Sequence, residues 1–291
     1  MATKSTNKKI ELLPYKNPGL SLEKRVEDLL GRLTLEEKIG QMCQLPIFAD
    51  LRRAVAERGI GSILCGVDEN VEELQHLAVE KTRLGIPLLV GIDAIHGHSM
   101  AYNATMFPTQ LGLSCAWDET LCEAVARATA KEMAYTGCQW TFSPVLCTAR
   151  DLRWGRVNET FGEDPYLIGK LACAMIRGYQ GKKLSDPDSV AACAKHFAGY
   201  GETMGGREAS ESDHSERKMR AVFLPPFEAA AQAGCASFMT AYQVINGVPC
   251  TTDAWLLRHV LRDEWKSDAM VVTDWANMGR VGAEQCTGSD E

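Results

Sequence analysis

Polar side chains stand at the carboxyl ends of four short apolar runs in this 291-residue sequence. They are Asp93 after PLLVGI, Lys195 and His196 after VAACA, Tyr242 after ASFMTA, and Asp274 after AMVVT. Carboxylates accept hydrogen bonds from hydroxyl groups and the basic side chains donate to them, so this set can hold each hydroxyl from both sides. Trp275, next to Asp274, offers a flat apolar face for a pyranose ring. The residues therefore favour an uncharged ligand with many hydroxyls.

A charged loop, RDLRWGRVNETFGEDP at 150–165, adds Arg156 as a candidate binding residue. Arg156 and Glu159 can form a rigid network there, although the charges of this loop also fit a solvated ion pair worth little. Taken alone, an aspartate followed by tryptophan after a strand is more often a turn or a helix cap than a nucleophile. Each signal is weak alone, and the shared position at the ends of apolar runs supports the prediction of a site.

Other features exclude several kinds of site and partner. His96 and His98 have the spacing of a metal-ligand pair, but no cluster of further ligands accompanies them, so we expect no metal and no cofactor. GYGETMGG (199–206) matches neither common phosphate-binding motif. The formal net charge of −7 argues against nucleic acid and membrane as partners, and leaves the oligomeric state open.

The eleven cysteines are odd in number and none are spaced Cys-x-x-Cys. Several fall inside predicted strands or helices, where cysteine behaves as a small buried hydrophobe. We therefore expect no disulfide scaffold. The N-terminus begins with basic residues but lacks the apolar region of a secretory signal, and we expect a cytoplasmic protein.

The apolar runs read as buried strands because they are short and do not alternate with polar residues. Amphipathic helical stretches lie between them, with start signals at the capping box Thr34-Leu35-Glu36-Glu37, at Asp118 and at Pro225. This alternation predicts a parallel α/β protein. In a (β/α)8 barrel all strand ends meet on one face, whereas a doubly wound sheet concentrates functional groups at one switch point. Polar groups at four strand ends therefore favour a TIM-type (β/α)8 barrel.

Seven segments resemble glycoside hydrolase family 3, of the β-glucosidase and β-xylosidase type, in order and spacing. They are GIPLLVGIDAIHG, FPTQLGLSCAWD, ARDLRWGRVNETFGEDPYL, ACAKHFAGYG, SERKMRAVFLPPFEAA, MTAYQVINGVP and MVVTDW. The resemblance implies a retaining exo-glycosidase that removes β-linked sugars from non-reducing ends, with a β-linked oligosaccharide or glycoside as partner. It identifies Asp274 as the nucleophile that forms a glycosyl-enzyme. It also implies that five residues line the subsite of the terminal sugar, with Trp275 flanking the next sugar: Asp93, Arg156, Lys195, His196 and Tyr242.

The same resemblance implies parts that this sequence lacks. A retaining mechanism needs a second carboxyl group about 5–5.5 Å from the first. In β-glucosidase-like members it comes from an α/β sandwich domain that follows the barrel. We therefore expect an N-terminal extension at 1–20 and, at 21–291, a family 3 barrel domain without its final unit and without that sandwich.

Two alternatives remain open at this stage. Single-domain β-N-acetylglucosaminidases of the family carry their acid/base on a barrel loop, and Ser212-Asp213-His214 makes His214 a candidate general acid. The spacing and order differ from that pattern, and His214 also fits a helix start near Ser215. The other alternative is a fragment that binds sugar without catalysis, or that is inactive.

Overall fold

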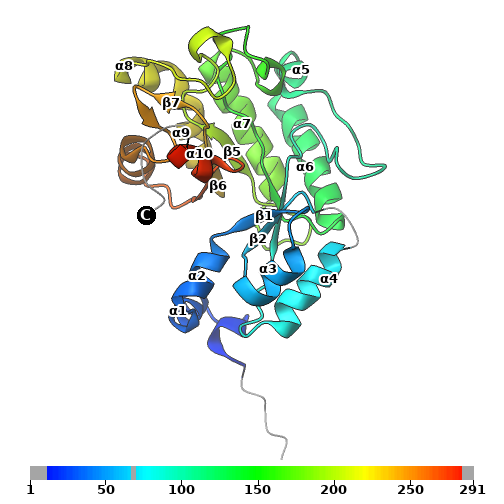
Figure 1. Cartoon of the computed structure of the whole chain (residues 1–291). Helices are drawn as coiled ribbons and strands as arrows, with labels where there is room; N and C mark the ends of the chain where they lie inside the picture. The colour runs from blue at the N-terminus through cyan, green and yellow to red at the C-terminus, as the bar shows by residue number, and fades with distance from the viewer. Residues whose placement is uncertain (1–11, 67–69, 284–291) are drawn as a thin grey trace, which may run out of the picture. The chain divides into compact units, whose positions relative to one another are not determined.

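The computed structural model describes residues 12–66 and 70–283 of the chain (Figure 1). They form two compact units. The first contains the chain up to Ser62 together with Glu73–Leu88, and the second contains Ile63–Glu72 together with Leu89 onward. All of the predicted site residues lie in the second unit. No helix among the described residues is long and apolar enough to cross a membrane.

The first unit is largely helical. Its elements are α1 (Leu22–Arg32), α2 (Leu35–Gln41), β1 (Gln44–Pro46), α3 (Leu51–Arg58) and the helical turn Leu77–Lys81, which continues α4 (Asn70–His76). The predicted capping box of α2 is confirmed, because Thr34 Oγ1 accepts from the Glu37 N–H and the Glu37 carboxylate accepts from the Thr34 N–H. A Cβ at Gly40 would lie 2.0 Å from the carbonyl oxygen of Arg58, so only glycine fits there.

The second unit is built on parallel strands. β2 (Ser62–Leu64), β3 (Leu89–Ile92) and β4 (Trp140–Thr141) are neighbours in one sheet, and β5 (Cys193–Phe197), β6 (Ser237–Thr240) and β9 (Met270–Val272) in another. The β3–β4, β5–β6 and β6–β9 pairs are all parallel. Parallel bridges from Trp140 to Ala191 and from Val145 to Lys195 join the β4 segment to the β5 segment. The predicted parallel α/β class is therefore confirmed.

Helices cover these strands and enclose the core. They are α5 (Gln110–Ser114), α6 (Glu119–Tyr135), α7 (Pro165–Gln180), α8 (Glu216–Lys218), α9 (Pro225–Gln232), the helix Trp255–Glu264 and α10 (Asn277–Ala283), with a small antiparallel hairpin of β7 (Val244–Ile245) and β8 (Val248–Pro249). α7 packs against α6 on one side and α9 on the other (Figure 1). A Cβ at Gly178 would lie 2.4 Å from the Glu123 carbonyl oxygen, so this glycine lets α7 approach α6 closely.

Most predicted element boundaries agree with the structure. Asp118 caps α6 by accepting from the Leu121 N–H, and α9 begins at Pro225. Helix α7 was not predicted, because the GEDP segment before it reads as a loop. Its start signal is nevertheless present, since the Asp164 side chain accepts from two backbone N–H groups and Pro165 occupies the first turn.

Candidate active site

Lys195 and Asp93 form an ion pair between the segments of β5 and β3, which lie on either side of the β4 segment. Lys195 lies in β5 and Asp93 directly follows β3. The lysine is only 3% exposed, and its Nζ donates to Oδ1 of Asp93, whose side chain is 47% exposed. A buried ammonium group is costly without an opposite charge, so the ion pair with Asp93 offsets part of the cost of burying Lys195. The pair places a cation inside the site and a carboxylate at its surface.

His196 is buried beside this pair and is held as a neutral ring. Its Nε2 lies 3.2 Å from Nη2 of Arg156. Because a guanidinium group can only donate, Nε2 must carry a lone pair, and the ring proton is on Nδ1. Nδ1 lies 3.4 Å from the Sγ of Cys147. Burial, together with the positive charges of Arg156 and Lys195, holds the pKa of His196 well below its ordinary value.

Asp274 follows β9 and keeps one carboxylate oxygen without a hydrogen-bond donor. Oδ1 accepts from the Trp275 N–H at 2.7 Å. Oδ2 lies 3.4 Å from Nε2 of His196, is buried, and has no hydrogen-bond partner among the described residues. Burial raises the pKa of the Asp274 carboxyl, while the charge of Lys195 acts in the opposite direction. The arrangement presents a largely buried carboxylate whose Oδ2 is free to react.

Tyr242 and Trp275 complete the surroundings of the carboxylate. The Tyr242 hydroxyl donates to the Trp275 carbonyl oxygen at 2.6 Å, and the guanidinium of Arg280 lies 4.9 Å from the centre of the Tyr242 ring. Burial and the nearby charge of Asp274 raise the pKa of the Tyr242 hydroxyl, so it remains protonated at neutral pH. Trp275 is 58% exposed and leaves an aromatic surface beside Asp274.

Arg156 is fixed by two carboxylates. Its Nε and Nη2 donate to the two oxygens of Glu159 at 2.8 and 2.9 Å, and its Nη1 donates to Glu208 at 3.1 Å. Burial lowers the pKa of Arg156, but the hydrogen bonds to Glu159 and the two negative charges outweigh it and the pKa is raised. The predicted network of Arg156 and Glu159 is therefore present, and it aims Nη2 at His196.

Comparisons with known proteins identify the family of this chain. Residues 34–290 match the family model described as "Glycosyl hydrolase family 3 N terminal domain". The chain belongs to glycoside hydrolase family 3. The family resemblance noted in the sequence is thus confirmed.

Curated relatives of this family 3 domain include β-glucosidases and β-xylosidases. The periplasmic beta-glucosidase of Salmonella typhimurium is 36% identical over 255 residues, covering 86% of this chain and 33% of the relative. A beta-xylosidase of Formosa agariphila is 40% identical over 223 residues, covering 74% of this chain and 31% of the relative. The chain thus spans about a third of the length of these relatives. The Salmonella protein is named as periplasmic, and the cytoplasmic location expected for this chain stays a prediction.

Solved structures show the same fold in related proteins. A beta-glucosidase involved in saponin metabolism from intestinal bacteria is 52% identical with a TM-score of 0.85, over 91% of this chain and 35% of that one. A variant beta-glucosidase of Listeria innocua in complex with laminaribiose is 37% identical with a TM-score of 0.83, over 90% of this chain and 38% of that one.

Sequence reasoning missed two residues of this family 3 domain's site. The Glu208 carboxylate accepts from Arg156, the Tyr200 hydroxyl and the Trp154 indole N–H, so three groups around the site depend on it. Cys147 contacts both the ring and the backbone N–H of His196. Glu208 lies 52 residues from Arg156 along the chain, and no local pattern marks it.

His214, the alternative acid/base, lies in a different setting. It is 2% exposed and its ring stacks on Phe223, with the ring centroids 4.5 Å apart. Its backbone N–H and carbonyl oxygen both bond to the side chain of Asn246. Burial, aided by the charge of Lys218, lowers the pKa of His214. The contacts of His214 are therefore those of a packed side chain, and its role as a general acid stays a prediction.

Proposed function

We propose that this chain carries the sugar-binding and nucleophilic part of a retaining exo-β-glycosidase of the β-glucosidase type. The observation that supports it most directly is the free Oδ2 of Asp274, buried beside His196 and within the field of Lys195 and Arg156. Carboxylates in this setting suit attack on an electrophilic carbon, because no bound proton has to be removed first. The cations Lys195 and Arg156 favour the ionised carboxylate and so oppose the effect of burial, which raises the pKa of the Asp274 carboxyl.

The proposed reaction consists of two displacements at the anomeric carbon of the terminal sugar. Oδ2 of Asp274 forms a bond to the anomeric carbon while the glycosidic C–O bond breaks, and the leaving oxygen takes a proton from a general acid. Water then attacks the same carbon, the bond to Asp274 breaks, and the water's proton passes to the group that acted as acid. The sugar leaves with its original β configuration after two displacements.

The other residues of the site are proposed to bind the terminal sugar. Asp93 can accept from hydroxyls, because it is half exposed while its partner Lys195 is buried. Lys195 and Arg156 can donate, and the Tyr242 hydroxyl, whose proton goes to the Trp275 carbonyl oxygen, can accept from a sugar hydroxyl. Trp275, largely exposed, can stack on the following sugar. The complex of the Listeria innocua relative with laminaribiose, together with other structures of that enzyme with glucose and isofagomine, supports a glucose-like ligand.

The barrel fold and the source of the general acid belong to the same proposal. The parallel order of strands supports a (β/α)8 barrel domain over residues 21–291, with the site on the face formed by the carboxyl ends of the strands. The relatives are about three times as long as the part matched here, so a further domain of the whole protein can supply the acid/base. We expect that domain to be the α/β sandwich of the β-glucosidase type.

A glucoside with an activated phenol leaving group tests the nucleophile without needing the acid. Such a leaving group departs with little protonation, so the chain should release a burst of phenol as Asp274 is glycosylated. Asp274→Ala should abolish the burst, while the matched control Asp268→Ala, an exposed aspartate close in sequence, should retain it. Sugar binding by a folded chain with no burst would instead favour the non-catalytic alternative. Turnover beyond the burst that is lost in His214→Ala, with the burst itself retained, would favour the β-N-acetylglucosaminidase-like alternative.

A further inference from the structure

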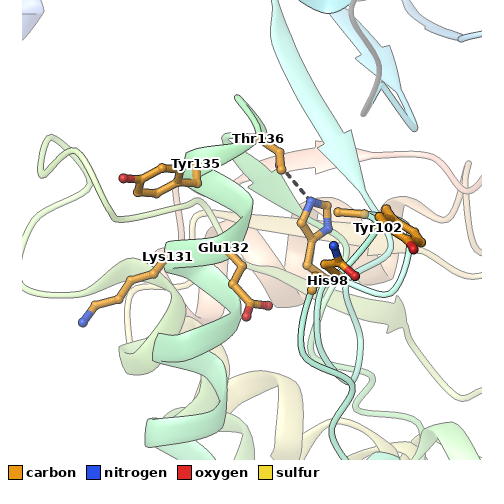
Figure 2. A pocket seen from close by; sticks show the side chains of 9 residues that line it. His98, Tyr102, Lys131, Glu132, Tyr135 and Thr136 are labelled. Atoms are coloured by element: carbon orange, nitrogen blue, oxygen red, sulfur yellow. Dashed lines mark hydrogen bonds between the residues drawn. The ribbon is translucent and has the colours of Figure 1, made fainter.

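A hollow of about 270 Å³ lies between the end of α6 and the segment that follows β3 (Figure 2). Tyr135 and Thr136, which line it, end α6 and precede β4, and His98 and Tyr102, on its other wall, follow β3. None of the residues that line the hollow belongs to the candidate active site described above, and the function proposed above does not use it.

His98, in the wall of this hollow, has a ring nitrogen that lacks a partner. The side chain is fully buried, and Nε2 lies 2.8 Å from the Thr136 hydroxyl. That hydroxyl donates its proton to the Met133 carbonyl oxygen at 2.9 Å, so it must accept from Nε2–H. Burial lowers the pKa of His98 and favours the neutral ring, which leaves a lone pair on Nδ1. No described residue donates to Nδ1, which is buried.

The rim of the hollow carries two aromatic rings that face water. Tyr102 is 95% exposed and Tyr135 is 98% exposed. Figure 2 shows Tyr102 on one side of His98, and Tyr135 with Lys131 on the other. The segment that bears Tyr102 is fixed, because the Glu132 carboxylate accepts from the backbone N–H of Thr105 at 3.0 Å and from its hydroxyl at 2.7 Å. One wall of the hollow is therefore fixed by hydrogen bonds, and Nδ1 of His98 is a hydrogen-bond acceptor without a donor.

We propose that this hollow is an ancillary site for one pyranose ring of a saccharide. A ring hydroxyl would donate to Nδ1 of His98, a C–H face would stack on Tyr102 or Tyr135, and the Lys131 ammonium group would donate to a second hydroxyl. A volume just below the range of about 300–1,000 Å³ for drug-sized ligands suits a single sugar ring. The carboxylate of Glu132 next to Lys131 disfavours an anion. The choice of sugar rests on the proposed function, because a β-glycosidase meets such glycans at its surface.

The test is a titration of the ¹⁵N-labelled chain with laminaribiose, followed through its backbone amide signals. We expect two responding groups, one around Asp93 and Lys195 and another at 98–106 and 131–136. In Asp93→Ala the first group should weaken and the second should persist. In the double variant Tyr102→Ala/Tyr135→Ala the affinity for laminaribiose reported by the second group of signals should fall about tenfold, because aromatic contacts contribute most there. Tyr166→Ala, another exposed tyrosine, serves as the matched control.

His98→Phe keeps an aromatic ring of similar size but removes the acceptor. This variant should lower the sugar affinity reported by the second group of signals about fivefold, which corresponds to one hydrogen bond. The dispersion of its remaining amide signals checks that it is folded. The proposal is overturned if 98–106 and 131–136 do not respond to the sugar. It is also overturned if their response disappears in Asp93→Ala or is unchanged in the double tyrosine variant. A response there with silent active-site signals and no phenol burst would reject the proposed function and leave the ancillary site standing.

Discussion

Nε2 of His196 lies 3.4 Å from Oδ2 of Asp274, and the histidine has no proton on that nitrogen to share. Arg156 donates to the same Nε2 from 3.2 Å, so the lone pair is already used. The His196 ring therefore lies against the Asp274 carboxylate without donating a proton or a hydrogen bond to it. An oxygen kept free in this way is suited to form a bond with a substrate, and its protonation should control the reaction.

The first prediction is the pH dependence of the phenol burst. Burial raises the pKa of the Asp274 carboxyl, and only the carboxylate can attack. The burst should therefore be present above this raised pKa and should be lost as the pH falls through it. Burst amplitude measured from pH 8 down to pH 4 checks this, with thermal unfolding at each pH to show that the chain stays folded. A burst that keeps its amplitude down to the ordinary aspartate range would contradict the assignment.

The second prediction concerns stability and uses the same group. Because the folded-state pKa of Asp274 is raised, the folded chain binds this proton more tightly than the unfolded chain does. Its contribution favours folding at low pH and is lost as the pH rises through the folded pKa. Asp274→Asn should therefore have a higher free energy of unfolding than the wild type at pH 7, and this difference should shrink at acidic pH. Urea unfolding at both pH values, with Asp268→Asn as control, measures it.

A third prediction assigns a positioning role to Cys147. Its Sγ lies 3.4 Å from Nδ1 of His196 and accepts from the His196 backbone N–H at 3.3 Å. Burial raises the pKa of this thiol to about 12, so it stays protonated and neutral. Cys147→Ala should leave the Nδ1–H without an acceptor and let the ring proton move to Nε2, whereas Cys147→Ser should keep the tautomer.

Long-range ¹⁵N–¹H spectra of histidine-labelled chain report which ring nitrogen carries the proton. Cys122→Ala, which also removes a fully buried sulfur but in α6, is the matched control for lost packing. If all three cysteine variants leave the His196 signals and the phenol burst unchanged, Cys147 is only a packing residue.

The fourth prediction concerns the pair of Asp93 and Lys195. Removing one partner of a fully buried pair costs about 3–5 kcal/mol, because the other charge is left uncompensated. Water reaches the half-exposed Asp93, so Asp93→Ala should cost less, about 2 kcal/mol of unfolding free energy. The double variant Asp93→Ala/Lys195→Met should recover most of this loss. Chemical unfolding of the wild type, both single variants and the double variant gives the coupling between the two residues, and purely additive losses would contradict it.

The strand ends could be predicted from the sequence because their signal is local. A run such as AMVVT is short, apolar and followed by a polar residue, and that is how β9 and Asp274 are arranged in the structure. Arg156 and Glu159 were predictable for the same reason, as they are three residues apart in one loop. The lack of a hydrogen-bond donor to Oδ2 was not predictable, because it depends on the tautomer of His196, which Arg156 sets from 40 residues away along the chain.

Residues that act through distant contacts escaped the sequence reading. Cys147 resembles any buried cysteine until its sulfur is found beside His196. Glu208 resembles any exposed loop carboxylate until Arg156, Tyr200 and Trp154 are found to donate to it. Neither residue type nor spacing distinguishes such residues, since the partners meet only when separate loops fold over the same strand ends.

Glu208 provides the last prediction. Glu208→Gln keeps the size of the side chain but replaces one acceptor oxygen by an NH₂ group, so one of its three donors loses its partner. An unsatisfied group of this kind costs about 1–3 kcal/mol, with the lower part of the range expected because Glu208 is 45% exposed. Arg156 should also be held less firmly, which should weaken sugar binding at the active site. Affinity for glucose and urea unfolding are the measurements, and Glu163→Gln, an exposed loop carboxylate, is the matched control. Equal behaviour of the two variants would show that Glu159 alone is enough to fix Arg156.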